Sequence, residues 1–137
     1  MALQFKSQCR DARLDAIETY GSTSCSFSVF TGAQPSDVLQ ANSGTLLVTF
    51  NLPTDWMAGA SGGSKAKAGT WSGTASGGAG ATPGHFRIYN SQATKDGTTC
   101  FIQGDAAIGS GSMNFDGTIT SGQTVTINSF TLTDGNA

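Results

Sequence analysis

The sequence predicts an all-β fold, an antiparallel β-sandwich or barrel of seven to eight strands with one short N-terminal α-helix. Three observations carry this prediction. Apolar residues alternate with polar ones in several short segments after residue 21. Turns rich in glycine and polar residues separate these segments, as in sandwiches and barrels. Only residues 7–20 form a convincing helical stretch, so the chain offers no long helix for parallel crossovers.

Length and charge set the first limits on organisation and partners. The 137 residues fit one folded body, which we divide into an N-terminal arm and helix (1–21) and a single β-sandwich domain (22–137). Charged residues make up 12% of the chain, about half the usual share, and the formal net charge is −2. Aromatic residues, at 9%, argue against disorder. So weak a net charge provides no attraction for nucleic acid, and we expect no nucleic-acid partner.

Hydrophobic runs and cysteines narrow the class further. The longest aliphatic run, residues 46–48, is far shorter than the roughly 20 apolar residues of a membrane helix, so we expect no membrane partner. The first ten residues lack the apolar stretch of a secretory signal. Cys9, Cys25 and Cys100 are odd in number and widely spaced, which argues against a disulfide framework or a zinc site. We interpret them as reduced thiols of a protein made in a cytoplasm.

The predicted helix covers residues 7–20, with Ser7 as its cap and Gly21 where it ends. Its apolar stripe is thin, with Leu14 and Ile17 one turn apart and Tyr20 beyond them. Six of the charged residues lie in the first 18 positions, which suggests a separate task for this segment. An isolated helix of this length is marginal in water and needs a surface to pack on. That surface is either its own sheet or another subunit, and both remain open.

The first half of the body shows two clear strands and a glycine-rich region. Cys25, Phe27 and Val29 alternate with serines, which predicts a half-buried strand. Residues 46–52 predict the clearest strand, and residues 54–57 are interpreted as one capped helical turn. In the glycine-rich stretch 59–84 we expect a strand near 69–75, anchored by Trp71, with mobile flanks.

The second half predicts a hairpin and two further strands. Residues 85–89 and 99–103 flank a turn at Asp96 and Gly97, with Phe86 and Ile88 inward. A strand is expected at 113–119. The last strand changes phase, because Val125 and Ile127 are apolar at odd positions and Phe130 and Leu132 at even ones. A bulge near residues 128–129 would keep all four inside.

Candidates for catalysis and metal binding are few. The only histidine, His85, is interpreted as a surface residue of its strand, on the face opposite Phe86. Asp11 and Asp15 alternate with basic residues, as on a solvated helix face. Lys65 and Lys67 are placed in an exposed glycine-rich loop that lacks phosphate-loop spacing. Ordinary turn chemistry accounts for the aspartates beside glycines, namely Asp105, Asp116 and Asp134. We therefore expect no enzyme activity, no cofactor and no metal.

A set of strings in order along the chain resembles a family of small virion structural proteins of tailed bacteriophages. The strings are RDARLDAIE (10–18), FTGAQP (30–35), GTLLVTFNLPTDWM (44–57), GHFRIYNS (84–91) and FTLTDGNA (130–137). The resemblance spans nearly the whole chain. It implies a non-enzymatic capsid cement or decoration protein with a jelly-roll-like sandwich, made in the host cytoplasm and located on the capsid surface of the virion. It supplies no functional residues to transfer by position.

The expected partner is then the major capsid protein, with neighbouring subunits bound and stabilised by many copies of the chain. We also expect a homo-oligomer, either a dimer or a trimer. From the helix itself we predict that the contact residues are Arg10, Arg13, Leu14 and Ile17. A head-fibre base or a tail or baseplate component is an alternative. A carbohydrate-binding module is another, if the aromatic side chains of Trp56, Trp71 and Tyr89 are exposed for stacking on sugars.

Overall fold

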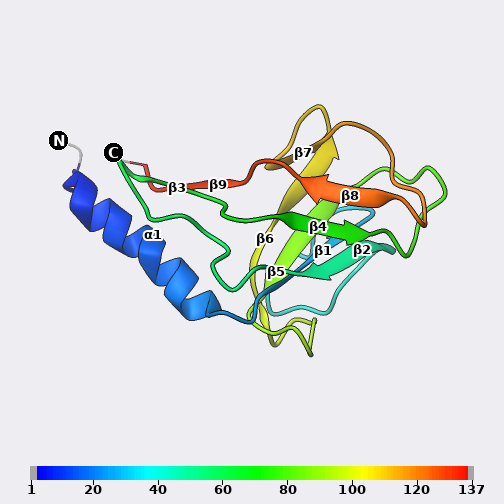
Figure 1. Cartoon of the computed structure of the whole chain (residues 1–137), viewed down its shortest axis with the longest axis horizontal. Helices are drawn as coiled ribbons and strands as arrows, with labels where there is room; N and C mark the ends of the chain where they lie inside the picture. The colour runs from blue at the N-terminus through cyan, green and yellow to red at the C-terminus, as the bar shows by residue number, and fades with distance from the viewer. Residues whose placement is uncertain (1–2, 136–137) are drawn as a thin grey trace.

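The structure, a computed structural model, describes residues 3–135 of the chain. It is all-β with a single helix, as the sequence predicts. In chain order the elements are α1 (Ser7–Gly21), β1 (Ser26–Phe30), β2 (Leu46–Asn51), β3 (Ser64–Ala66), β4 (Trp71–Thr74), β5 (His85–Tyr89), β6 (Cys100–Ile108), β7 (Met113–Phe115), β8 (Thr124–Ile127) and β9 (Thr131–Thr133) (Figure 1). The strands of the described residues number nine because β3 forms in the glycine-rich region and the expected last strand is divided into β8 and β9.

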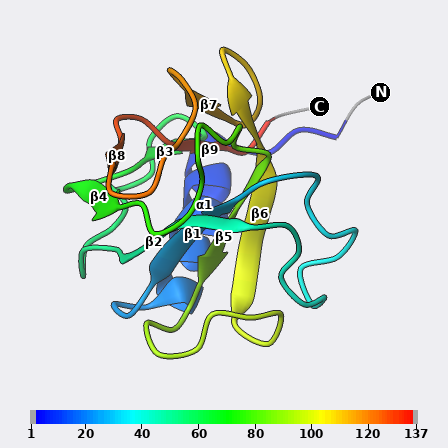
Figure 2. The ribbon, with the colours of Figure 1, turned by 90° about the vertical axis from the view of Figure 1, so that its right-hand side faces the viewer.

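Seven of these strands form one curled layer, which is built from two separate hydrogen-bonded sheets. Five are hydrogen-bonded in the order β2-β1-β5-β6-β7. The β4–β8 pair is the second sheet and lies next to β2, where the amides of Ser76 and Gly77, just after β4, donate to the carbonyl of Leu47. Pairing is antiparallel except between β6 and β7, which run parallel. The layer curls from β8 round to β7 (Figure 2), and within residues 3–135 those two strands are not paired with each other.

The apolar core lies inside this curl. The ring of Phe27 on β1 is at its centre, with centroids 5.1 Å from Phe50, 5.9 Å from Phe86 and 6.0 Å from Trp71. Phe86 and Ile88 are buried on the inner face, as the alternation predicts, and Trp71 is fully buried as the expected anchor. Burial of each such large side chain contributes about 1.5–3 kcal/mol to the free energy of folding. Since alternation places these side chains on one face of the strands, the layer curls around that face.

The outer face of the layer is polar and also buried, because residues 31–43 cross over it. Ser28 on β1 is 1% exposed, and His85 and Arg87 on β5 are 0% exposed. The crossing segment supplies acceptors for His85 and Arg87: the carbonyl of Gly32, for example, lies 2.9 Å from Nδ1 of His85. The hydroxyl of Ser28 donates instead to Thr49 on β2 at 2.9 Å. The predictions of a half-buried first strand and of a surface His85 are therefore wrong. A buried polar side chain costs less when protein acceptors replace water, and the crossing segment provides such acceptors for Nδ1 of His85 and for Arg87.

Helix α1 and the short β3–β9 ribbon form an extension beside the body (Figure 1). The helix has the predicted extent, but Ser7 is its first helical residue instead of its cap. The N-cap position belongs to Lys6, which makes no side-chain capping bond. At the other end a Cβ on Gly21 would lie 2.7 Å from the ring of Phe101 and 2.8 Å from the indole of Trp56. Glycine therefore allows the helix end to touch the body.

Three further sequence predictions need correction. Residues 54–57 form no helical turn. Met57 pairs with Lys67 in an isolated antiparallel bridge, which requires an extended backbone at this position. The strand expected at 113–119 ends at Phe115. In place of a bulge near residues 128–129, the chain changes partner: β8 pairs with β4, and β9 pairs with β3. Because of this change of partner, the apolar residues at odd positions (Val125 and Ile127) and those at even positions (Phe130 and Leu132) all pack on the core.

Candidate functional site

The structure separates the four predicted contact residues into two groups. Arg10 and Arg13 both bind Asp134, next to the end of β9. Nη1 of Arg10 donates to the Asp134 carbonyl at 2.9 Å, and Nε of Arg13 lies 2.7 Å from its carboxylate. Leu14 is buried, with 3% exposure. Ile17 is half-buried beside open surface, and Arg13, although it is paired with Asp134, is exposed beside the same surface. Three of the four residues thus fasten the helix to its own chain, whatever else Arg13 contacts.

Beside Ile17 lies an open apolar hollow, which we call the α1–β6 groove. Its volume is about 510 Å³. It is lined by Arg13, Ala16, Ile17 and Tyr20 of α1, by Val38 and Leu39 of the crossing segment, and by Cys100, Phe101 and Ile102 of β6. Two large side chains stand at its rim in water: Tyr20 is 66% exposed and Leu39 is 75% exposed. The Tyr20 and Phe101 rings are 5.6 Å apart, centroid to centroid.

Helical periodicity explains why α1 presents this face. Residues 13, 16, 17 and 20 fall on one side of an α-helix, since positions three and four apart are neighbours. The adjoining side is turned to the β3–β9 ribbon. There Asp11 accepts a hydrogen bond from the amide of Gly63 at 2.7 Å, and Asp15 accepts one from the amide of Ala60 at 3.0 Å. The acidic residues that sequence reasoning placed on a solvated face therefore attach the helix.

A buried cation completes this attachment. Lys65 on β3 is 1% exposed, and its Nζ lies 2.7 Å from Asp15, 2.7 Å from Glu18 and 2.8 Å from the carbonyl of Ala58. Burial lowers the pKa of Lys65, but hydrogen bonds with Asp15 and Glu18 outweigh burial and raise it. The bond from Lys65 holds the pKa of Asp15 below its usual value. The expectation of an exposed Lys65 is wrong because two helix carboxylates cover it.

The opposite wall of the groove is held by a second buried cation. Arg87 donates to the carbonyls of Val38 at 2.6 Å and Gln40 at 3.0 Å, and to Oδ1 of Asn42 at 2.7 Å. Two of these acceptors flank Leu39 in the chain. The guanidinium group therefore fixes the backbone on both sides of Leu39, while the side chain of Leu39 stays exposed. Sequence reasoning identified Ile17 and noted Tyr20, but not Leu39 or Phe101, which come from distant segments.

The buried reactive groups have structural surroundings. Burial lowers the pKa of His85, and its Nε2 has no hydrogen-bond partner within residues 3–135. Burial raises the pKa of the Cys25 thiol to about 12 and also raises that of Cys100, which makes both poor nucleophiles at neutral pH. All three cysteines are free, and Cys9, unlike the other two, is exposed. Within the described part of the chain, no cluster of three or more His, Cys, Asp or Glu side chains is placed to hold a metal ion.

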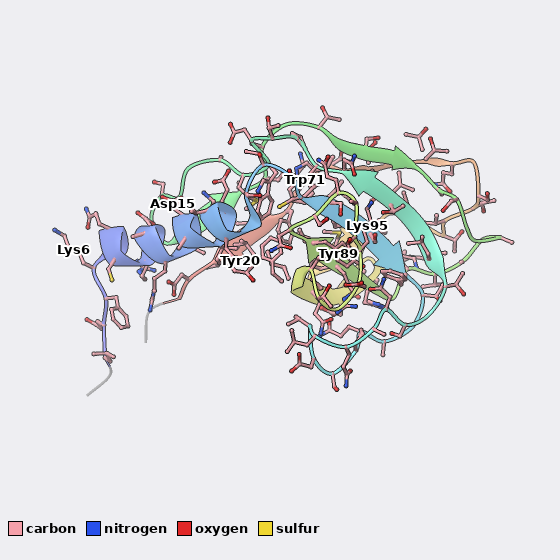
Figure 3. The ribbon with its side chains drawn as sticks, turned by 90° about the horizontal axis from the view of Figure 1, so that it is seen from below. Lys6, Asp15, Tyr20, Trp71, Tyr89 and Lys95 are labelled. Atoms are coloured by element: carbon pink, nitrogen blue, oxygen red, sulfur yellow. The ribbon has the colours of Figure 1, made fainter. Side chains whose placement is uncertain are left out.

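The aromatic side chains proposed for sugar stacking are in the interior. Trp56, Trp71 and Tyr89 are each 0% exposed, and Figure 3 shows Trp71 and Tyr89 inside the β body while Tyr20 lies at the end of α1. The condition attached to the carbohydrate-binding alternative, exposure of these three rings, is therefore not met. Burial raises the pKa of Tyr89 to about 12, in keeping with a hydroxyl that donates to Asn42 at 2.9 Å.

Comparisons with family models, curated proteins and solved structures gave no match. The helix of the described chain is too short and too polar to cross a bilayer. The α1–β6 groove is therefore the main candidate for a functional surface, on the strength of its own geometry.

Proposed function

We propose that the chain is a non-enzymatic decoration protein of a tailed-phage capsid, which binds neighbouring major capsid subunits through the α1–β6 groove and so stabilises the head. The single observation that carries the binding part is the groove itself, with Tyr20 and Leu39 exposed at its rim. Contiguous apolar surface in a water-soluble domain marks an interaction site. The resemblance of the sequence to small virion proteins supports the choice of partner.

The groove suits a partner that inserts an apolar side chain. Its walls are fixed by Lys65 on the helix side and Arg87 on the other, so little order has to be created on binding. The hydrophobic contribution of one such contact is modest, since burial contributes about 25 cal/mol per Å². Many copies on a repeating shell multiply modest contacts into stable attachment. A homo-oligomer, dimer or trimer, would strengthen attachment in the same way.

Two alanines of α1 provide a matched test. Ala16 lines the groove and Ala12 does not, while both side chains are exposed on the same helix. Ala16→Asp places a carboxylate in the groove, and Ala12→Asp adds the same charge elsewhere. The assay is co-sedimentation with capsid shells of the source phage that lack the chain. We expect Ala16→Asp to lower the bound fraction about tenfold, equivalent to about 1.4 kcal/mol, with Ala12→Asp binding like the parent chain.

The outcomes separate the site from the function. Equal binding by both variants would remove the groove from the mechanism but leave the decoration role. If the parent chain stays in the supernatant while the shells sediment, the decoration role is overturned. Copy number then distinguishes the virion stations: hundreds of copies per particle indicate decoration of the head, and a dozen or fewer indicate the alternative of a head-fibre base or a tail or baseplate component.

A further inference from the structure

The curled layer is open along one line, between its two end strands. β7 pairs only with β6, and β8 pairs only with β4, in the part of the chain that the structure describes. We call the space between them the β7–β8 seam (Figures 1 and 2). The connection between the strands, residues 116–123, does not fill it. That connection pairs instead with Ala81, through two hydrogen bonds between the backbones of Ala81 and Ile119, of 2.9 and 2.8 Å.

The register of β8 shows which of its backbone groups face the seam. In antiparallel pairs, directly opposite residues alternate between hydrogen-bonded and non-hydrogen-bonded positions. The amide of Ala75 donates to the carbonyl of Gln123, which makes this a hydrogen-bonded position. Val125 and Ile127 then bond to β4 as well. The N–H and C=O groups of Thr124 and Thr126 point the other way, into the seam.

The same reasoning applies to β7. Phe115 accepts a hydrogen bond from the amide of Gly109, which follows β6, and it is paired with Ile108 in the parallel register. The backbone groups of Phe115 and Met113 are thus directed to β6. Those of Asn114, between them, face the seam. The two strands present their unused donors and acceptors on this side, and within residues 3–135 no other strand receives them.

The space in the seam is real and polar. Two hollows of about 220 and 160 Å³ lie between the strands, and both are lined by Phe115, Asp116 and Thr126 together with their neighbours. The larger is walled mainly by amide and hydroxyl side chains, including Asn128 and Ser129. Asp116 is the only charged residue in the lining of either hollow.

Shortness is the only common protection against strand addition that β7 and β8 carry. Natural edge strands commonly contain lysine, proline or an inward-pointing charge. The sequences of β7 (Met-Asn-Phe) and β8 (Thr-Val-Thr-Ile) contain none of these, and every residue of β8 is β-branched. Their shortness, three and four residues, limits the length of any added strand to about four paired residues.

We propose that the β7–β8 seam binds an extended polypeptide segment of a partner protein, which adds as a strand between β7 and β8. Backbone hydrogen bonds to Asn114, Thr124 and Thr126 provide the affinity, as in other strand-addition complexes. Small hydroxyl or amide side chains of the segment fit the polar hollows, and a basic side chain pairs with Asp116. This surface is distinct from the α1–β6 groove, so the proposal does not depend on the decoration role.

Proline substitution tests the backbone directly. Because the Asn114 amide faces the seam, Asn114→Pro removes a donor for the added strand and leaves the β6–β7 bonds intact. The Asn114 side chain also accepts a bond from the Gly109 amide at 2.8 Å, which the substitution removes. Asn114→Ala removes the same side-chain bond but keeps the amide, so it is the matched control. Thr126→Pro and Thr126→Ala form the corresponding pair on β8.

The probe is a random library of peptides of about ten residues, selected on the immobilised full chain, followed by synthesis of the enriched peptides. We expect binding to fall about tenfold or more in each proline variant and to persist in each alanine variant. The amides of Asn114, Thr124 and Thr126 should become protected from hydrogen exchange when peptide binds. Failure to enrich any peptide, or equal binding to the proline and alanine variants, would overturn the proposal. Loss of binding on Ala16→Asp would place the peptide in the α1–β6 groove and overturn it too.

Discussion

The ammonium nitrogen of Lys65 lies 2.7 Å from Oδ1 of Asp15, beneath a helix that joins the body through few apolar contacts. The lysine is almost fully buried, whereas the aspartate is half exposed. The two partners are therefore unequal. Losing the carboxylates leaves a charge inside the protein, but losing the lysine leaves carboxylates that water can reach.

This inequality predicts an asymmetric response to mutation. The double variant Asp15→Asn, Glu18→Gln should lower the melting temperature by roughly 10 °C, because it leaves the buried Lys65 charge with neutral partners. Lys65→Met should lower it much less, since methionine fills the same buried space. Differential scanning calorimetry checks both. Equal losses would show that the carboxylates and the lysine contribute only as a pair.

Acidification should weaken folding through the only histidine of the chain. Burial, and the nearby charge of Arg87, lower the pKa of His85 in the folded state from its usual 6.5. The unfolded chain then binds a proton at pH values where the folded chain does not, so stability falls as the pH drops below about 6.5. The urea midpoint should be higher at pH 7.5 than at pH 5.5.

The control for that measurement is His85→Asn, whose amide can still donate to the carbonyl of Gly32. The variant has no imidazole to titrate in this pH range, and the difference between its two midpoints should be much smaller than in the parent chain. A pH dependence that persists in the variant would assign the effect to another group.

Arg87 should control both stability and the wall of the groove. Arg87→Met leaves the partly buried carbonyls of Val38 and Gln40 without their donor, at a cost of about 2–4 kcal/mol. Urea unfolding measures the loss, and amide exchange across residues 31–43 should accelerate. Lys95→Met removes a partly exposed cation and should change stability by less than about 0.5 kcal/mol. Unchanged exchange in the arginine variant would show that other contacts hold this segment.

Gly21→Ala should destabilise the chain by about 1–3 kcal/mol, although alanine favours helices, because the added methyl group would overlap Phe101 and Trp56. Gly59→Ala is the matched control, since a Cβ there meets nothing within 4 Å. Thermal unfolding of the two variants gives the comparison. A stabilised Gly21→Ala variant would mean that the helix end can move away from the body at little cost.

The sequence correctly predicted those parts of the fold that residues close together in the chain determine. Alternation placed Phe27 and Phe86 in the core, and the absence of glycine and proline defined the helix. The failures share a cause. His85, Arg87 and Lys65 carry polar groups, which alternation assigns to water, yet each is buried by a segment distant in the sequence. Their burial depends on acceptors from that segment, and no pattern within one strand can reveal those acceptors.

Only one wall of the α1–β6 groove could be predicted from the sequence, for the same reason. Ile17 belongs to a helix stripe that periodicity reveals, so the sequence led to one wall. Leu39 lies in a turn-rich stretch with no period, and Phe101 lies on a strand whose outward face is ambiguous. The groove exists because the crossing segment and β6 come together beside α1, and this tertiary arrangement has no signature in any one of the three segments.

The ion pair between Arg13 and Asp134 brings the two ends of the described chain to the same tip of the molecule (Figure 1). A short linker could therefore join the ends, and the chain could be opened at a surface loop far from them. A peptide fused to either end would emerge at this one tip, away from the β7–β8 seam. The protein would then act as a carrier that displays its cargo in one direction while the opposite end remains free to bind.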